Sequence, residues 1–146
     1  MNELKTRFPE QVVVIGCGRL GSLLAGELSR AGSRVVVIDR DSTAFDVLDS
    51  GFSGFRVTGD AVEKDVLLEA DLKRADCLLA TTQKDTVNLM VAQVAKVLFS
   101  VPLVLARVYD PKREILYRQF NIETISPTSL TVHEFLRAVR LHGGRK

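Results

Sequence analysis

The stretch VVVIGCGRLGSLLAGELSRAGSRVVVIDR, residues 12–40, decides the fold of this chain. It begins with a continuous run of β-branched residues, which is typical of a strand buried on both faces of a parallel sheet. Leucines at helical spacing follow, and Gly32 stands where the end of a helix is expected. Because RVVVID then reads as a second buried strand, the stretch predicts a strand, a helix and a parallel strand.

A glycine pattern, G-x-G-x-x-G, separates the first strand from the helix. The pattern alone is weak evidence, but here it follows a buried strand, opens an amphipathic helix and is followed by Asp39 at the end of the second strand. Gly16 permits a tight turn, Gly18 leaves room for a phosphate, and Gly21 lets the helix pack closely on the sheet. The positive end of the helix attracts the anion. The predicted phosphate-binding residues are Gly16, Cys17, Gly18, Arg19, Leu20 and Gly21.

Three charged side chains refine this prediction. Asp39 is expected to accept hydrogen bonds from ribose hydroxyls and to repel a 2′-phosphate, which favours NAD or an adenine nucleotide over NADP. Arg40 is compatible with a 2′-phosphate, but we favour stacking on adenine or solvent exposure. Arg19 opposes the helix dipole unless an anion lies nearby, so we favour a contact with phosphate over pairing with a surface carboxylate.

The rest of the chain continues the alternation of strands and helices. Further strands are predicted over residues 55–59, 77–82, 102–108 and 121–126. Helices are predicted over residues 41–51, 62–68, 86–99, 110–120 and 128–141, with caps at Asp41, Asp110 and Ser126. We therefore expect one α/β domain over residues 1–146, a doubly wound Rossmann-like parallel sheet of about six strands with helices on both faces. Its ends, residues 1–10 and 143–146, are expected to be flexible.

In an open parallel sheet the ligand lies beyond the carboxyl ends of the strands. The candidates at the ends of the later strands are Asp60, Thr81, Thr82 and Arg107. Asp60 either hydrogen-bonds an adenine edge or caps the next helix, and the sequence leaves both open. Thr81 and Arg107 are equally open between a binding role and a structural one.

The last predicted helix is apolar on two sides. Val132, Phe135, Leu136 and Val139 form one stripe, and Leu130 and Leu141 fall nearly opposite. One face is expected to cover the chain's own sheet and the other to meet a neighbouring subunit, with surface scatter as the alternative for the second pair.

Composition and charge exclude several classes of function. The chain has 46% hydrophobic and 26% charged residues and a formal net charge of +2, so nucleic acid is not expected as a partner. The two cysteines, Cys17 and Cys77, lie in apolar runs and are predicted to be buried free thiols in a reducing compartment. Without an apolar run of about 18 residues, the chain is expected to be soluble and cytoplasmic.

Patterns of catalysis are missing from the sequence. Neither tyrosine carries a lysine four positions later, as in short-chain reductases, and His133 and His142 lie without a second ligand at metal spacing. The sequence has neither a G-x-S-x-G turn nor a G-x-x-x-x-G-K-[ST] loop. A cofactor cleft without a catalytic lobe favours a sensor, with no metal, over an enzyme. The alternative is an NAD-dependent oxidoreductase that completes its active site with another chain.

From residue 12 to residue 139 the chain resembles the RCK or KTN nucleotide-binding domains, also called TrkA-N, of potassium channels and transporters. The resemblance rests on GCGRLG, VVVID, GDA at residues 59–61, TTQKDTVNLM, and ARVYDP at residues 106–111. It implies a regulatory domain that binds NAD(H) or ATP, ADP or AMP and couples occupancy to the gating of a potassium uptake system, without chemistry on the ligand.

The resemblance also implies roles for single residues. The loop glycines and Arg19 would hold phosphates, Asp39 the ribose, Arg40 and the Asp60–Ala61 pair the adenine region, and Thr81 and Arg107 the cleft wall. It further implies a homodimer or a larger ring and a membrane potassium transporter or channel as partner, so that the chain would lie at the inner face of the membrane. Members often carry a second ligand-binding domain after the last helix, which is not expected here.

Overall fold

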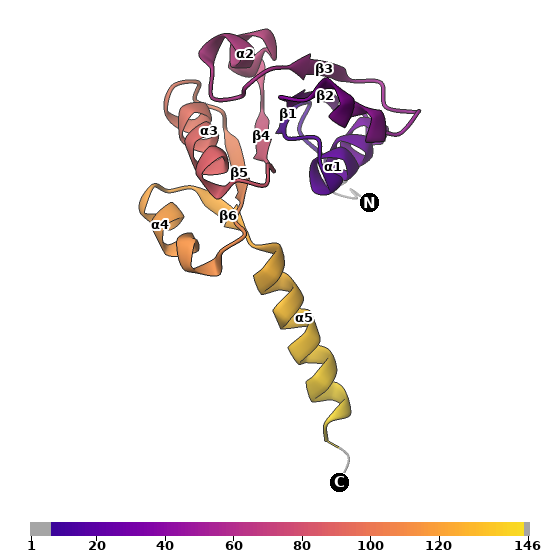
Figure 1. The fold of residues 1–146 in the computed structure, drawn as a ribbon, viewed down its shortest axis with the longest axis vertical. Helices are drawn as coiled ribbons and strands as arrows, with labels where there is room; N and C mark the ends of the chain where they lie inside the picture. The colour runs from indigo at the N-terminus through magenta and orange to yellow at the C-terminus, as the bar shows by residue number, and fades with distance from the viewer. Residues whose placement is uncertain (1–6, 145–146) are drawn as a thin grey trace, which may run out of the picture.

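The computed structural model describes residues 7–144, which form one six-stranded sheet in the order β3-β2-β1-β4-β5-β6 (Figure 1). All five strand pairings are parallel. The strands are β1 (Gln11–Ile15), β2 (Arg34–Asp39), β3 (Phe55–Thr58), β4 (Cys77–Ala80), β5 (Leu103–Arg107) and β6 (Glu123–Ile125). The helices are α1 (Arg19–Arg30), α2 (Lys64–Glu69), α3 (Asp85–Val97), α4 (Glu114–Gln119) and α5 (Pro127–His142), with short 3-10 helices η1 (Ser42–Val47), η2 (Leu72–Arg74) and η3 (Pro111–Arg113). The predicted fold class is confirmed.

The sheet is covered on both faces. Successive residues of a strand point to opposite faces, and in β1 Val12 belongs to the core beneath α1, whereas Val13 belongs to the core beneath α2, α3 and α4. Phe45 of η1 completes the first core, and Leu67 and Tyr117 lie in the second. The central strands β1, β2, β4 and β5 are mostly apolar because both of their faces are largely buried, whereas the edge strands β3 and β6 are largely exposed and carry polar residues.

The packing face of α1 differs from the predicted leucine stripe. Leu23 is 68% exposed, and the buried residues of the helix are mostly small. They are Gly21, Ser22, Ala25, Gly26 and Leu28. The reason is the close approach of helix and sheet, since a Cβ added at Gly21 would lie 1.9 Å from the carbonyl oxygen of Gly16. Small residues therefore decide which face packs.

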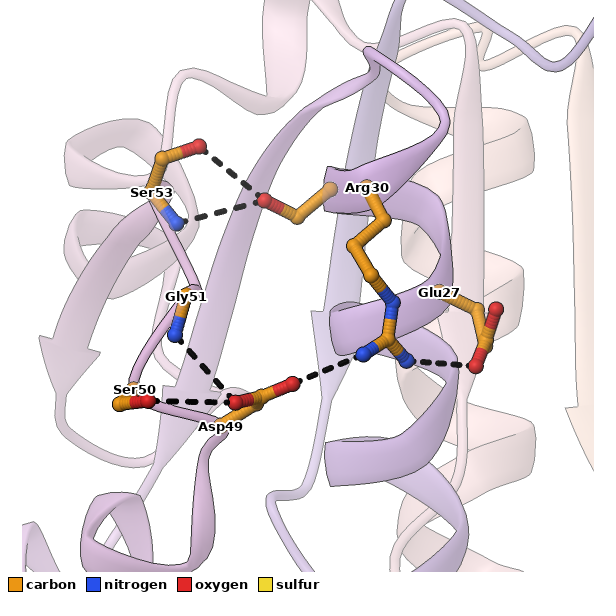
Figure 2. A network of polar contacts seen from close by, with 7 residues as sticks. Glu27, Arg30, Asp49, Ser50, Gly51 and Ser53 are labelled. Carbon is orange, nitrogen blue, oxygen red and sulfur yellow. Dashed lines mark hydrogen bonds and ion pairs between the residues drawn. The ribbon is translucent and has the colours of Figure 1, made fainter.

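The segment after β2 is shorter than the predicted helix. Asp41 caps it as expected, because its Oδ1 accepts a hydrogen bond from the Thr43 amide at 2.9 Å, but only a 3-10 helix forms. Figure 2 shows how the following loop is tied to the end of α1: Arg30 donates to Asp49 at 2.8 Å and also pairs with Glu27. These exposed contacts fix the path of the chain from η1 towards β3.

The last helix corrects a second prediction. Ser126 caps α5, its hydroxyl oxygen accepting from the Ser129 amide at 3.1 Å, and Pro127 follows in the first turn. No residue of α5 is buried, and the helix projects away from the body of the domain (Figure 1). The expected packing on the chain's own sheet is therefore wrong, because α3 and α4 already cover the adjacent face.

The remaining predictions concern the cysteines, membrane-spanning helices and the ends of the chain. Cys17 and Cys77 are buried and free, as predicted. Within residues 7–144, none of the helices has the length and apolarity that crossing a membrane requires. The ends predicted to be flexible are residues 1–10 and 143–146, of which residues 1–6 and 145–146 lie outside the described residues. Among the others, the carbonyl oxygens of Pro9 and Glu10 accept hydrogen bonds from Ser33 and Arg34.

Candidate functional site

The order of the strands places the candidate site where β1 and β4 lie side by side. The chain leaves β1 towards α1 on one face of the sheet and leaves β4 towards α3 on the other, so loops diverge at this edge. The carboxyl ends of parallel strands at such a switch point are the usual place for a ligand. The predicted glycine loop, the Thr81–Thr82 pair and Arg107 all follow or end strands at this edge.

Each of the three glycines has a different physical reason. Gly16 has φ +94°, and a Cβ there would lie 3.1 Å from the Thr82 nitrogen, so a side chain would be strained and crowded. Gly21 is held by the close contact with the Gly16 carbonyl oxygen. Gly18 has no heavy atom within 4 Å of an added Cβ, so open space lies in front of it. The structure therefore leaves room at Gly18, where the sequence predicts a phosphate.

The start of α1 is arranged to attract an anion. Gly18 is its N-cap and supplies no side chain, and no acidic residue lies in the first turn of this 12-residue helix. The first amides of a helix have no partner within the helix, and its dipole places partial positive charge there. Arg19 is exposed, and no carboxylate of the described residues lies within the 4.0 Å of an ion pair. Backbone and side chain both favour negative charge at this point.

Asp39 has a role that the sequence did not reveal. Its Oδ2 accepts a hydrogen bond from the Cys17 amide at 2.8 Å, and its Oδ1 accepts one from the Asp41 amide at 2.9 Å. The carboxylate thus clamps the glycine loop to the end of β2. Because each oxygen has a second lone pair, the carboxylate keeps the capacity to accept from sugar hydroxyls. Burial, followed by the charge of Asp39, raises the pKa of the Cys17 thiol to about 11, so this thiol is inert.

Two predicted residues make structural contacts instead of facing outward. Thr81 is buried, and its hydroxyl donates to the carbonyl oxygen of Ile15 at 2.9 Å, which holds the start of the glycine loop. Asp60 accepts from the Val62 amide at 3.1 Å and so caps the turn that follows β3, whereas the N-cap of α2 is Glu63, so Asp60 does not cap the next helix. Ala61 is packed in the core.

A cluster around Thr82 joins the ends of β4 and β5. The Thr82 hydroxyl donates to Asn88 Oδ1 at 2.6 Å, and Asn88 Nδ2 donates to the carbonyl oxygens of Thr82 and Arg107, each at 3.0 Å. Asn88 is not among the residues predicted from the sequence. The sequence does contain a sign of this role, because an asparagine on the apolar face of a predicted helix requires buried hydrogen-bond partners.

Arg107 lies against the same cluster. Its Nη2 donates to the carbonyl oxygen of Thr82 at 3.1 Å and to the Tyr109 hydroxyl at 2.7 Å, and its guanidinium carbon lies 4.5 Å from the centre of the Tyr109 ring. Its Nε is buried and has no hydrogen-bond partner among the described residues. Asp85 holds the Tyr109 amide at 2.8 Å. The guanidinium thus stands at the carboxyl edge of the sheet.

Two hollows lie elsewhere in the domain. One of about 310 Å³ lies between the strands β1–β3 and the end of α2, and one of about 390 Å³ lies between α2, η2 and the end of α3. Neither includes a residue of the glycine loop. The first hollow is rimmed by charges of both signs, and the second by Lys64 and Lys73 beside apolar side chains. We favour the glycine loop as the ligand site, because it offers a phosphate both the free amides and the positive end of a helix. Among residues 7–144 no group of acidic, histidine or cysteine side chains is arranged to hold a metal ion.

Comparisons with known proteins place this geometry in a family. The TrkA-N domain model matches residues 12–127. The Trk system potassium uptake protein TrkA of Streptomyces coelicolor is 42% identical over 126 residues, which are 86% of this chain and 56% of that protein. The TrkA homologue of Pyrococcus abyssi is 27% identical over 135 residues, 88% of this chain and 59% of that protein. The chain thus spans little more than half the length of these curated relatives.

Solved structures show the same fold at lower identity. The TrkA-N domain of the inner membrane protein ybaL from Escherichia coli superposes with a TM-score of 0.80 at 20% identity, covering 90% of this chain and 98% of that one. The GsuK channel bound to NAD gives a TM-score of 0.77 at 24% identity, with 92% and 24% covered. The Kef CTD of Shewanella denitrificans in its AMP-bound form gives 0.76 at 23% identity, with 92% and 82% covered. With its glycine loop inside the matched residues 12–127, this chain belongs to the TrkA-N domain family.

Proposed function

We propose that this chain is a regulatory nucleotide-binding domain of a potassium uptake system. It binds NAD(H) or an adenine nucleotide, ATP, ADP or AMP, and converts occupancy into a change in transporter gating. The observation that carries the proposal is the uncapped start of α1 with open space at Gly18, beside the clamped carboxylate of Asp39. The relatives named for Trk potassium uptake, and the bound NAD and AMP of two proteins with the same fold, support it.

The ligand follows the carboxyl edge of the sheet. The amides of the glycine loop and Arg19 hold the phosphates, and the free lone pairs of Asp39 accept from a ribose. Arg40 and the turn at Asp60 and Ala61 border the adenine, and the Thr81–Thr82 pair and Arg107 form the opposite wall. A 2′-phosphate is disfavoured, because it would stand beside the carboxylate of Asp39.

Catalysis is not part of the proposal. Hydride transfer requires a second group that holds substrate and moves a proton beside the nicotinamide. At the carboxyl edge the side chains of Thr81, Thr82 and Asn88 are already engaged with each other and with backbone carbonyls, which leaves them committed to structure. The chain therefore serves as a sensor.

The partners are a second copy of the chain and a membrane potassium transporter or channel. Six apolar side chains of α5 are between 51% and 69% exposed, four of them in one stripe and two nearly opposite, and exposed apolar stripes mark interaction surfaces. They are Leu130, Val132, Phe135, Leu136, Val139 and Leu141. Because symmetric pairing buries the same face on both subunits, α5 is the element through which we place the homo-oligomer. Contact with the transporter then holds the assembly at the inner face of the membrane.

Calorimetric titration of the purified chain with AMP, ADP, ATP, NAD⁺ and NADH tests the binding step. We expect at least one of them to bind with a dissociation constant below the millimolar range, and NADP⁺ to bind more weakly than NAD⁺. No binding of any of them at millimolar concentration overturns the proposal. Potassium-limited growth and rubidium uptake of a host lacking the gene test the transport step, with restoration by the wild-type chain as the expected result.

A further inference from the structure

Asn88 stands at the centre of the carboxyl edge. It belongs to α3 and its exposed fraction is 0%. Its Oδ1 accepts from the Thr82 amide at 2.9 Å and from the Thr82 hydroxyl at 2.6 Å. Its Nδ2 donates to the carbonyl oxygens of Thr82 and Arg107, each at 3.0 Å. The amide therefore uses both of its donors and both lone pairs of its oxygen.

These four bonds connect the ends of β4 and β5, and the end of β1 lies against the same cluster. Thr82 follows β4, Arg107 ends β5, and a Cβ at Gly16, just after β1, would lie 3.1 Å from the Thr82 nitrogen and 3.2 Å from its Cα. The backbone of Thr82 is thus the wall against which the glycine loop turns. A displacement of Thr82 displaces the loop on one side and Arg107 on the other.

We infer that Asn88 is a positioning residue of the nucleotide site, which sets the spacing between the glycine loop and Arg107 without touching the ligand. The inference rests on the proposed function. The Thr82 carbonyl oxygen accepts from both Asn88 Nδ2 and Arg107 Nη2, so the same backbone atom that Asn88 holds also orients the guanidinium. Removing the amide leaves the Thr82 amide and the Arg107 carbonyl oxygen without this partner and takes one bond from the Thr82 hydroxyl, which keeps its contact with the Lys84 carbonyl oxygen at 3.2 Å. All three groups lie at the edge where the ligand is proposed to bind.

A matched pair of variants separates positioning from general stability. Asn88→Leu keeps the number and branching of the side-chain heavy atoms and removes all four bonds. Val91→Ala weakens the core one turn further along the same helix, where the exposed fraction is also 0%. Both variants are expected to lose thermal stability. Asn88→Leu is expected to weaken ADP and NAD⁺ binding by about tenfold or more, since buried polar groups lose their partners, and Val91→Ala is expected to leave the affinity unchanged. The affinities of both variants for ADP and NAD⁺ are measured by titration calorimetry well below their melting temperatures.

The circular dichroism of the tyrosines distinguishes a positioning role of Asn88 from a general contribution to stability. The chain has two tyrosines and no tryptophan, so near-ultraviolet circular dichroism reports on Tyr109 and Tyr117. Tyr109 lies against the Arg107 guanidinium, and the Tyr109→Phe variant identifies its share of the signal. We expect Asn88→Leu to change that share, and Val91→Ala to preserve it.

A milder variant keeps the test decisive if Asn88→Leu does not fold. Thr82→Val removes the hydroxyl's bond to Asn88 together with its longer contacts to the backbone of Lys84, leaves the Asn88 bonds to the backbone in place, and is expected to weaken ADP binding in the same direction but by less. Unchanged affinity in folded Asn88→Leu and Thr82→Val, with the wild type binding normally, overturns the inference alone. A wild type that binds neither ADP nor NAD⁺ overturns the proposed function and the inference with it.

Discussion

At the scale of the residue, Gly18 and Gly21 are needed for different physical reasons. Gly18 has φ −83°, which any residue adopts, and nothing lies within 4 Å of an added Cβ. Gly21 has a backbone oxygen 1.9 Å from that position. A side chain at Gly18 therefore enters open space, where we propose that the phosphate binds, and one at Gly21 collides with the backbone of the protein itself.

The first prediction follows from this difference. Gly18→Val is expected to melt within a few degrees of the wild type and to lose most of its nucleotide affinity, because the new side chain occupies the space for the phosphate. Gly21→Ala is expected to lose about 1–3 kcal/mol of unfolding free energy, the usual range for overpacking. Thermal melts and ADP titrations of both variants measure this. Normal ADP affinity in Gly18→Val would contradict the placement of the phosphate.

The second prediction concerns the thiols. Burial, and after it the charge of Asp39, raises the pKa of Cys17 to about 11, and burial with the charge of Asp76 does the same for Cys77. At pH 8 only about one thiol in a thousand is then ionised in the folded state. Dithionitrobenzoate is expected to leave both thiols unreacted in the native protein and to titrate two per chain in urea. Rapid native reaction of either thiol would contradict their burial.

At the scale of the element, the sequence predicts the alternation well and the packing faces poorly. Strands buried on both faces are apolar throughout, and the predicted caps Asp41, Asp110 and Ser126 each accept a backbone hydrogen bond in the structure. These signals are local. The face of α1 depended on the approach of Gly21 to Gly16, which is set by the tertiary structure.

The candidate site divides in the same way. The glycine loop, Asp39 and Arg107 could be placed at the carboxyl edge of the sheet because their positions follow from strand ends. Asn88 could not be assigned, because its role depends on the meeting of the ends of β4 and β5. The inward-turned hydroxyl of Thr81 likewise depends on its neighbour β1. Ligand contacts themselves stay a prediction.

The third prediction concerns α5. Phe135 and Leu136 are 69% and 59% exposed, so the domain does not depend on them for its own core. Phe135→Ser with Leu136→Ser is expected to convert the proposed oligomer to monomers while leaving the melting temperature of the domain nearly unchanged. Sedimentation velocity gives the mass and calorimetry the stability. Exchange of the exposed Arg140 for Ser on the same helix serves as the control, and a doubly substituted variant that stays oligomeric would exclude α5 from the interface.

The whole molecule combines a rigid edge with a projecting helix. Val108, after β5, donates its amide to the carbonyl oxygen of Ile125 at 3.0 Å, and α5 begins two residues later at Pro127. The cluster that holds Arg107 is thus part of the same body from which α5 emerges. A nucleotide shifts an equilibrium between assemblies only by the difference in its affinity for them, so a ligand that orders this edge equally in both would regulate nothing.

The last prediction concerns the unfolding free energy of the whole domain at high pH, which depends on the ionisation of Tyr117. Burial, and then the charge of Asp85, raises the pKa of Tyr117 to about 12, while Arg113 opposes the shift. The hydroxyl donates to the Asp85 carbonyl oxygen, a bond that the phenolate cannot make. Because the folded pKa lies above the unfolded value of about 10, the stabilisation is complete below pH 10 and is lost as the pH rises towards 12.

Urea unfolding of the wild type and of Tyr117→Phe at pH 8, 10 and 11 measures this loss. At pH 8 the wild type is expected to be the more stable, and the difference is expected to shrink above pH 10, by on the order of 2 kcal/mol in full. Other groups titrate in the same range, but they are common to both proteins, so the difference isolates Tyr117. A constant difference from pH 8 to pH 11 would mean that the Tyr117 phenol ionises equally easily in the folded and the unfolded chain. The hydrogen bond from the Tyr117 hydroxyl in α4 to the Asp85 carbonyl oxygen at the start of α3 would then add no pH-dependent stability.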